Sequence, residues 1–210
     1  MPEVAPVLMV FAEEALVEAE LVGGGLGCPL CAGVLAPWGF ARRRSIRLRR
    51  DATMSLRPRR SKCRACTRSH VLLPDLCLLR RQYEAAVIGA AIEARASGCC
   101  GYRRIARELG VPVRTVRRWL GRFACNAEQV RGHFTRWAFA LDPELAPILP
   151  AGGWFADALE AIGVAVRAWV LRLGGRAVWS VVALLSGGML LATRGDLFPA
   201  VTLAETVPRS

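Results

Sequence analysis

Apolar residues recur at helical spacing along much of the chain after residue 74. One such stripe includes Tyr83 and stops at Ala96-Ser97-Gly98, and a second covers 102–109. A third begins at 113 and is separated from the second by Gly110-Val111-Pro112. The pattern therefore predicts three consecutive helices, of which the last two are joined by a tight turn.

The C-terminal part of the chain also has a helical pattern. Asn126 and Gln129 are spaced as a capping box, which predicts a helix start at this point. Asp142-Pro143 and Gly174-Gly175 are typical of helix ends. Three helices are predicted here, at 126–141, 155–173 and 177–192. We expect them to support the preceding part of the chain or to mediate dimerisation.

The segment between residues 34 and 48 has a different pattern. Its apolar residues stand among arginines, which predicts short strands joined by a basic loop. These apolar residues are Val34, Leu35, Trp38, Ile46 and Leu48.

Positive charge is concentrated in the middle of the chain. Of the 29 basic residues all but Lys62 are Arg. Residues 42–123 carry 22 basic and five acidic residues, a net charge of +17, whereas residues 1–41 carry −5 and residues 124–210 are neutral overall. This concentration indicates a polyanionic partner, and nucleic acid fits better than a membrane surface. The alternative is an arginine-rich surface that contacts only solvent.

Residues 177–193 are the stretch that most resembles a membrane span. They number 17, short of the roughly 20 residues that a span needs, and Gly187-Gly188 interrupts them. A buried helix is the favoured interpretation, and a membrane-tethered DNA-binding protein is the alternative. Met1-Pro2-Glu3 lacks the basic start of a signal peptide, so we expect a cytoplasmic protein associated with the bacterial nucleoid.

Two Cys-x-x-Cys pairs indicate a metal site. Cys28 and Cys31 form the first pair, Cys63 and Cys66 form the second, and 31 residues separate the pairs. In a reducing compartment such pairs favour metal over disulfides. Four thiolates from two turns make the closed tetrahedral set that structural zinc prefers, with no position open for a catalytic water. The sequence therefore predicts structural Zn²⁺ in a zinc ribbon.

The remaining cysteines and one nearby histidine are interpreted differently. His70 is an alternative ligand, but four cysteines already satisfy a zinc ion, so a position in a strand is favoured. The other cysteines lack ligand spacing and are predicted to be small buried apolar residues. They are Cys77, Cys99, Cys100 and Cys125.

The helices predicted over 102–109 and from 113 have the pattern of a helix-turn-helix. Ile105 and Leu109 are spaced to face a core, and Ala106 is small where two helices cross. Gly110 permits a left-handed turn, and Pro112 suits the start of the next helix. The apolar arc of that next helix is predicted to be Val116, Trp119, Leu120 and Phe123.

The opposite face of this predicted recognition helix is basic. It comprises Arg114, Thr115, Arg117, Arg118 and Arg122. Arg117 and Arg118 lie at its centre and are predicted to contact base edges. Phosphate contacts are predicted for Arg103, Arg104 and Arg107 in the preceding helix and for Arg57, Arg59, Arg60, Lys62 and Arg64 in the basic loop. The alternative is an amphipathic helix that binds protein.

No catalytic site is predicted. The acidic residues after position 123 are interpreted as residues of turns, caps and the solvated surface. They include Asp142, Glu144, Asp157, Glu160 and Asp196. His133 has no acid or nucleophile near it in the sequence. We therefore expect a protein without enzymatic activity.

These predictions combine into a mostly α fold with a small β zinc ribbon. An acidic and apolar lead-in over 1–27 is followed by the zinc ribbon over 28–74. A helix-turn-helix DNA-binding domain is expected over 75–124, and a helical C-terminal region over 125–210.

Several short motifs occur in a fixed order ahead of the predicted helix-turn-helix. They are Cys28-Pro29-Leu30-Cys31, Pro37-Trp38-Gly39, Arg57-Pro58-Arg59-Arg60, Cys63-Arg64-Ala65-Cys66 and Val71-Leu72-Leu73-Pro74. This order resembles actinobacterial zinc-ribbon plus helix-turn-helix proteins, a family of unknown function similar to the N-terminal regions of insertion-sequence transposases. The resemblance covers roughly residues 5–125. It implies zinc at the four paired cysteines and DNA contact through the helix that begins near Arg114.

The leading hypothesis is a zinc-dependent, sequence-preferring protein that binds double-stranded DNA. It would act in transcription regulation or as an accessory to a mobile element. The alternative is a catalytically inactive transposase remnant or a protein-interaction module. With this hypothesis go two further candidate partners, a second copy of the chain in a homodimer and a separate recombinase.

Overall fold

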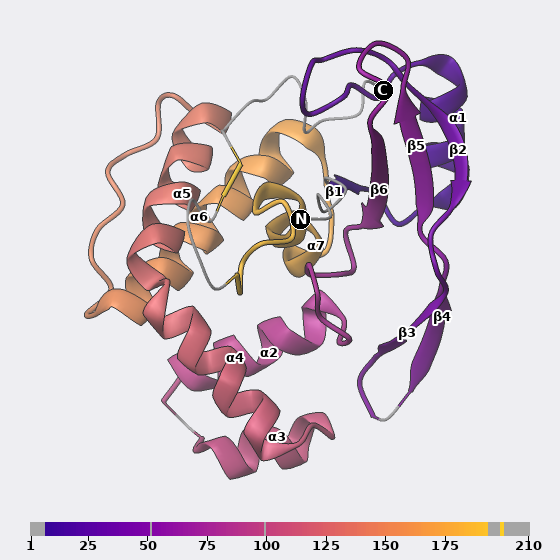
Figure 1. The fold of residues 1–210 in the computed structure, drawn as a ribbon. Coiled ribbons are helices and arrows are strands. Elements are labelled where there is room, and N and C mark those ends of the chain that lie inside the picture. The colour runs from indigo at the N-terminus through magenta and orange to yellow at the C-terminus, as the bar shows by residue number, and fades with distance from the viewer. Residues whose placement is uncertain (1–6, 51, 99, 193–197, 200–210) are drawn as a thin grey trace.

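A four-stranded sheet and a layer of helices make up a mixed α/β fold, with seven helices among the described residues (Figure 1). The computed structural model describes residues 7–50, 52–98, 100–192 and 198–199. The strand order of the sheet is β1-β6-β5-β2. The strands are β1 (Val7–Val10), β2 (Leu35–Phe40), β5 (Arg59–Cys63) and β6 (Ser69–Pro74). β1 runs parallel to β6, and the other neighbours are antiparallel.

The N-terminal segment is part of this sheet. β1 pairs with β6 along its whole length, and α1 (Glu14–Gly23) covers the sheet. Val17 and Leu21 of α1 are buried in the same core as Leu72 of β6. The lead-in expected over 1–27 therefore shares a core with the strands that follow it, in the part that the structure describes.

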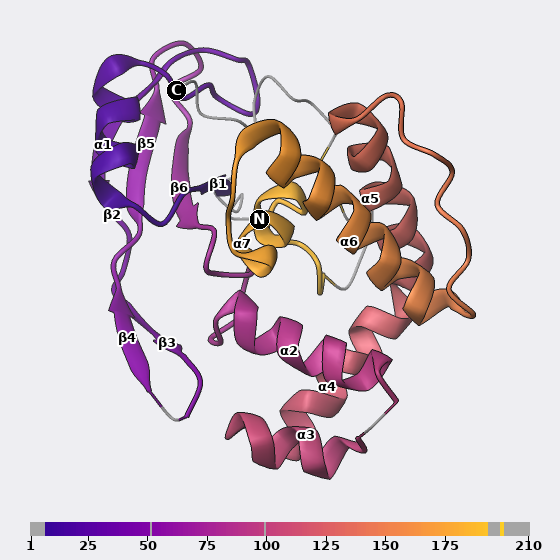
Figure 2. The same cartoon turned by 180° about the vertical axis from the view of Figure 1, so that it is seen from behind.

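A separate two-stranded hairpin extends beyond the ends of β2 and β5 (Figure 2). It consists of β3 (Arg44–Arg47) and β4 (Thr53–Leu56), which confirms the short strands expected here. Ile46 and Leu56 are buried against Leu73 and Cys77, so the base of the hairpin is fixed to the rest of the protein.

Six further helices form the other layer. They are α2 (Ala85–Ala96), α3 (Tyr102–Leu109), α4 (Val113–Cys125), α5 (Ala127–Leu141), α6 (Trp154–Leu173) and α7 (Val178–Leu185). Both views place α7 between the sheet and α6, with α2, α3 and α4 at the end away from α1 (Figures 1 and 2). The apolar arc predicted for α4 is buried at all four positions, because each faces the core that these helices share.

Two predicted features of the C-terminal helices are wrong. α7 ends at Leu185, because Gly187 and Gly188 have φ angles of 58° and 72° and turn the chain out of the helix. Asn126 forms no capping box, since its side-chain amide donates a hydrogen bond of 2.9 Å to the Ala192 carbonyl instead. α5 follows α4 after this single residue, so the chain needs no separate helix start here.

The cysteines outside the two pairs differ in exposure. Cys77 is buried as predicted, whereas Cys100 is half-buried and Cys125 is exposed. Cys125 follows the buried Phe123 by two residues, which turns it about 200° away from the core side of α4. Glu3, Cys99, Thr193 and Asp196 lie outside the described residues.

His133 of α5 is a structural residue of the helical core. The Leu185 carbonyl accepts hydrogen bonds from His133 Nε2 at 2.8 Å and from Trp137 Nε1 at 3.1 Å. The His133 ring also stacks on Phe198. Burial lowers the pKa of His133 to about 4, so the ring is neutral at pH 7.

Gly89 lets α2 and α7 approach closely. A Cβ atom at Gly89 would lie 1.9 Å from the Trp179 ring, whose Nε1 is held by a hydrogen bond to Glu93. We expect Gly89→Ala to lower the free energy of unfolding by about 1–3 kcal/mol, because the ring has to move. Gly121→Ala in α4 is the matched control, since nothing lies within 4 Å of a Cβ there and the variant gains helix propensity. Urea unfolding measures both, and equal stability of the two variants would contradict this close packing.

Asp75 connects the sheet to the segment before α7. Its carboxylate is buried and lies 3.6 Å from the Arg176 guanidinium, which also pairs with Glu13 at 3.4 Å. Burial raises the pKa of Asp75 from 3.8 to about 6, and Arg176 only partly opposes this. The contribution of Asp75 to stability is thus present at low pH and is lost as the pH rises to about 6.

Asp75 and His133 have opposite effects on stability between pH 4 and pH 6. The lowered pKa of His133 makes stability fall as the pH drops from 6.5 towards 4. We therefore expect Asp75→Asn to steepen the loss of stability on acidification, because the variant lacks the contribution of Asp75 that opposes that of His133. Thermal unfolding from pH 7 to pH 4 measures this, and a shallower dependence in the variant would refute the assignment.

No single helix of the described residues is long and apolar enough to cross a membrane. α6 and α7 are together long and apolar enough, but the chain bends by 97° between them.

Candidate metal centre and basic helical face

The sulfur atoms of Cys28, Cys31, Cys63 and Cys66 all lie within 4.8 Å of one another. The shortest separations are 3.5 Å between Cys31 and Cys63 and 3.7 Å between Cys28 and Cys66. A metal with bonds of about 2.3 Å to four sulfurs in a tetrahedron sets the sulfurs about 3.8 Å apart. The four thiols are therefore close to the positions that such a metal requires, and they could hold one.

The two cysteine turns have the same backbone structure. The amide of the first cysteine donates to the carbonyl five residues later, at 2.8 Å from Cys28 and 2.9 Å from Cys63. The carbonyl of the same cysteine accepts from the amide four residues later, at Ala32 in one turn and Thr67 in the other. Both of these residues have positive φ, 56° and 59°. The same strained turn thus occurs at both cysteine pairs. This repetition indicates that each turn serves to hold two thiols on the same side.

Gly33 allows the two turns to meet. A Cβ atom at this position would lie 2.8 Å from Ala65 Cβ and 3.1 Å from Cys63 Sγ. Any larger residue would therefore separate the two pairs. The isolated bridge between Gly27 and Val34 closes the first turn, and β5 and β6 flank the second.

The electrostatics of the cluster favour a bound cation. The Cys66 amide donates to Cys63 Sγ at 3.4 Å and, with the Ala65 amide, lowers the pKa of the Cys63 thiol to about 6 despite its burial. The Arg68 amide lowers the pKa of Cys66, but burial and the neighbouring thiols outweigh it and raise this pKa to about 12. Four thiolates this close repel one another, so full ionisation needs a positive ion between them.

His70 lies beside the cluster. It is buried in β6, as the favoured interpretation of the sequence has it, and its Nε2 is 3.3 Å from Cys28 Sγ. Among the described residues, the group that could hold a metal comprises the four cysteines and does not include His70.

The turn between α3 and α4 has the features that the sequence predicted. Gly110 has a φ of 66°, and the Val111 amide donates to the Ala106 carbonyl at 2.9 Å. Pro112 precedes the first residue of α4, which has no side-chain cap. Ile105, Ala106 and Leu109 of α3 are buried against α4 and α2.

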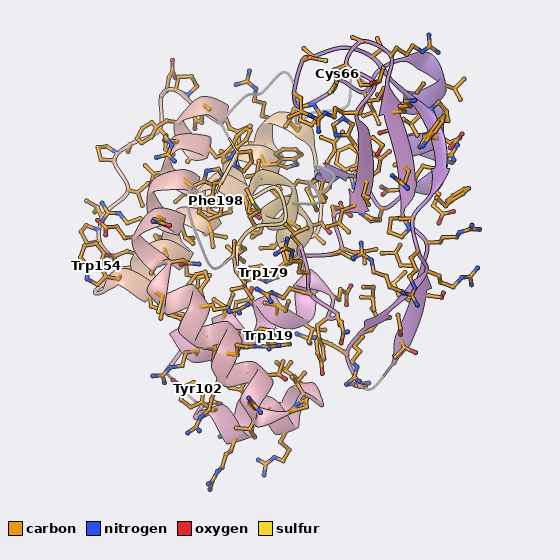
Figure 3. The ribbon with its side chains drawn as sticks, viewed as in Figure 1. Cys66, Tyr102, Trp119, Trp154, Trp179 and Phe198 are labelled. Atoms are coloured by element: carbon orange, nitrogen blue, oxygen red, sulfur yellow. The ribbon has the colours of Figure 1, made fainter. Side chains whose placement is uncertain are left out.

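The outward side of α4 is basic. Arg114, Arg117 and Arg118 are exposed, whereas Thr115 and Arg122 are half-buried. Arg117 lies over the Tyr102 ring, with its Cζ 5.6 Å from the centroid, and Arg95 of α2 contacts the same ring. Cys66 and Tyr102 lie at opposite ends of the molecule, so the cysteine cluster and α4 are separate sites (Figure 3).

Arg80 and Arg81 lie near the basic side of α4. The sequence did not predict them as residues of this site. Burial, together with the positive charges of Arg122, Arg118 and Arg80, lowers the pKa of Arg81 to about 10. Arg81 also donates to the Leu191 carbonyl. Two adjacent arginines are visible in the sequence just ahead of α2. Their position beside α4 depends on tertiary contacts, so the sequence pattern did not predict it.

The predicted phosphate-contacting residues divide into two groups. Arg103 and Arg107 of α3 are exposed, and Arg104 pairs with Glu108 at 2.8 Å. The residues over 57–64 do not form the expected loop, since most of them lie in β5. There Arg59 makes a two-pronged ion pair with Glu18 of α1, at 2.8 and 2.9 Å.

Three other basic side chains of this second group also have partners. Arg60 donates to Ser69, Lys62 lies over the Trp38 ring, and Arg57 lies over the Phe40 ring. Arg64 is exposed in the second cysteine turn. The basic residues of β5 thus contact the sheet or α1, whereas those of α3 and α4, apart from the half-buried Arg122, are exposed.

The fold and the cysteine cluster define a mixed α/β protein with a candidate four-cysteine metal centre and a basic helical face. Residues 28–119 match the model of a domain of unknown function (DUF6431), which spans all four cysteines and ends within α4. Neither the curated proteins nor the solved structures contain a match to this chain. The resemblance to actinobacterial and transposase sequences stays a prediction.

Proposed function

We propose that the protein is a zinc-dependent, non-enzymatic binder of double-stranded DNA in which α3 and α4 form a helix-turn-helix. The observation that carries this proposal is the division of α4 into two faces. Val116, Trp119 and Phe123 are buried, whereas Arg114, Arg117 and Arg118 on the opposite side face solvent. A helix with one face anchored and a basic face exposed is suited to the major groove of DNA.

Zinc is the metal that we propose for the four cysteines. An all-sulfur tetrahedral set selects soft or borderline metals, and Zn²⁺ is the usual occupant of such sites. Its role would be structural, because four protein ligands leave no position for water or substrate. The metal would hold the turn at Cys28 against the turn at Cys63 and so fix β2 beside β5.

The proposed contacts to DNA differ along the helices. Arg117 and Arg118 would contact base edges, and the contact of Arg117 with the Tyr102 ring supports this role by limiting the freedom of its side chain. Arg103 and Arg107 of α3, which are exposed, would contact phosphates. A role in transcription regulation or in a mobile element would follow from the sequence that α4 selects.

Binding of zinc-loaded protein to a labelled duplex over a series of salt concentrations tests the proposal. We expect the logarithm of the association constant to fall linearly with the logarithm of salt concentration, by about 0.9 for each phosphate contact. A preferred duplex should bind more tightly than a scrambled one. Weak binding that is equal for all sequences would favour the transposase remnant or the protein-interaction module instead.

A further inference from the structure

The β3–β4 hairpin is strongly basic and is not used by the proposed recognition helix. Residues 42–56 contain six arginines and one acidic residue, Asp51. Of these arginines, all but the half-buried Arg44 are exposed. Arg49 and Arg50 lie at the turn, where the Leu48 amide donates to the Ala52 carbonyl at 2.8 Å. The hairpin therefore carries exposed arginines from its base to its tip.

The hairpin points to the same end of the molecule as α3 and α4. Its tip and α3 lie at the same end in both opposite views, away from α1 (Figures 1 and 2), and Cys66 lies at the other end (Figure 3). The buried residues Ile46 and Leu56 hold its base in place. A projecting element with a fixed base can keep its charges at a set position relative to α4.

A chain of contacts joins the hairpin to α4. The Arg47 amide donates to the Gln82 carbonyl at 2.7 Å, and the Glu84 amide donates to the Arg47 carbonyl at 3.0 Å. The Arg47 guanidinium lies over Tyr83, and the Tyr83 ring packs edge-on against Trp119 of α4 at 4.9 Å between centroids. The isolated bridge between Arg47 and Tyr83, together with the rings of Tyr83 and Trp119, thus links the two basic elements.

The segment between them is also positive. Arg80 and Arg81 precede Tyr83 by a few residues, and the charges of Arg118 and Arg122 of α4 act on Arg81. Basic groups therefore continue from α4, through the segment ahead of α2, to β3. Like charges gathered in this way repel one another until an anion binds.

We propose that the β3–β4 hairpin is a second DNA-contacting element, which binds phosphates beside the groove that α4 occupies. This inference rests on the proposed function. A two-stranded ribbon is narrow enough to follow a groove edge, and guanidinium groups form paired hydrogen bonds with phosphate oxygens. Because phosphates carry no sequence information, the hairpin adds affinity for every sequence and leaves the choice of sequence to α4.

Removing the two arginines of the tip tests this inference. The test measures binding of full-length, zinc-loaded protein to a duplex of about 30 base pairs. We expect the double substitution Arg49→Ser, Arg50→Asn to weaken this binding on the order of tenfold. The slope of log K against log salt concentration should fall in magnitude by about two. Asn is chosen because Arg50 has a φ of 55°, which Asn tolerates. Arg49→Lys with Arg50→Lys should restore most of the affinity. Zinc content and thermal unfolding should equal those of the wild type, since both side chains are exposed.

Arg131→Gln with Arg136→Gln is the matched control, because it removes the same charge from exposed positions of α5. This control should bind DNA within about twofold of the wild type at moderate salt. If the tip variant binds as tightly as the control and with the same salt slope, the inference about the hairpin is overturned and the proposed function stands. If the wild type itself binds no duplex, the proposed function is overturned together with the inference.

Discussion

Replacing Cys63 with serine should release the metal and unfold the sheet. Cys63 is buried, its sulfur lies 3.5 Å from Cys31 Sγ, and it receives an amide hydrogen bond, so it is central to the cluster. Structural zinc sites contribute roughly 10–16 kcal/mol to folding, comparable to the roughly 5–15 kcal/mol net stability of a whole domain. A serine hydroxyl is a poor substitute for a thiolate, so the variant should lose most of this contribution.

Metal analysis and thermal unfolding of the purified variant measure this effect. The wild type should contain close to one equivalent of zinc, and its unfolding temperature should fall when a chelator is added. Cys125→Ser is the matched control, because that thiol is exposed and distant in sequence from the cluster, and it should keep both zinc and stability. Wild-type protein that folds fully without metal, or a Cys63→Ser variant as stable as the control, would refute a structural metal.

Replacing Arg117 and Arg118 together with alanine should abolish sequence preference. Each base-contacting arginine is worth about 1–3 kcal/mol, so the pair should cost roughly a hundredfold or more on the preferred duplex. On a scrambled duplex the loss of affinity should be much smaller, because the substitutions there reduce only the non-specific attraction between the protein and the phosphates. Both side chains are exposed, so thermal unfolding should be unchanged.

Arg103→Ala provides the comparison for this pair. Arg103 is exposed on α3 and is proposed to contact a phosphate, so its loss should weaken all duplexes alike and reduce the salt slope by about one. Parallel binding curves for the two variants on preferred and scrambled DNA separate these roles. Equal losses on both duplexes in both variants would contradict base contact by α4.

Local patterns in the sequence were enough to predict the six helices from α2 onward and the cysteine cluster, whereas α1 was not predicted. The apolar arc of α4 and the turn at Gly110 each depend on residues that are close in the chain. The two cysteine pairs were recognisable because each pair fits in one turn of four residues, whose shape the structure repeats. Helical spacing likewise predicted the end of α5 before Asp142-Pro143.

Features that depend on contacts distant in the sequence were not predicted. β1 pairs with β6, which is more than 60 residues away, and its four residues are too few to give a clear strand pattern. Arg59 was predicted to contact a phosphate, but it forms an ion pair with Glu18, 41 positions away, that links β5 to α1. Asn126 fits a cap by its local sequence, but the distant Ala192 carbonyl takes its side chain.

The central claim is that α4 selects a DNA sequence. Selection of random and genomic duplex DNA on the zinc-loaded wild type, with sequencing of the bound fragments, tests it most directly. The account predicts an enriched motif that is lost when Arg117 and Arg118 are replaced with alanine and is kept in the Arg131→Gln, Arg136→Gln control. Bound fragments with no shared motif, from protein with intact zinc and fold, would contradict it.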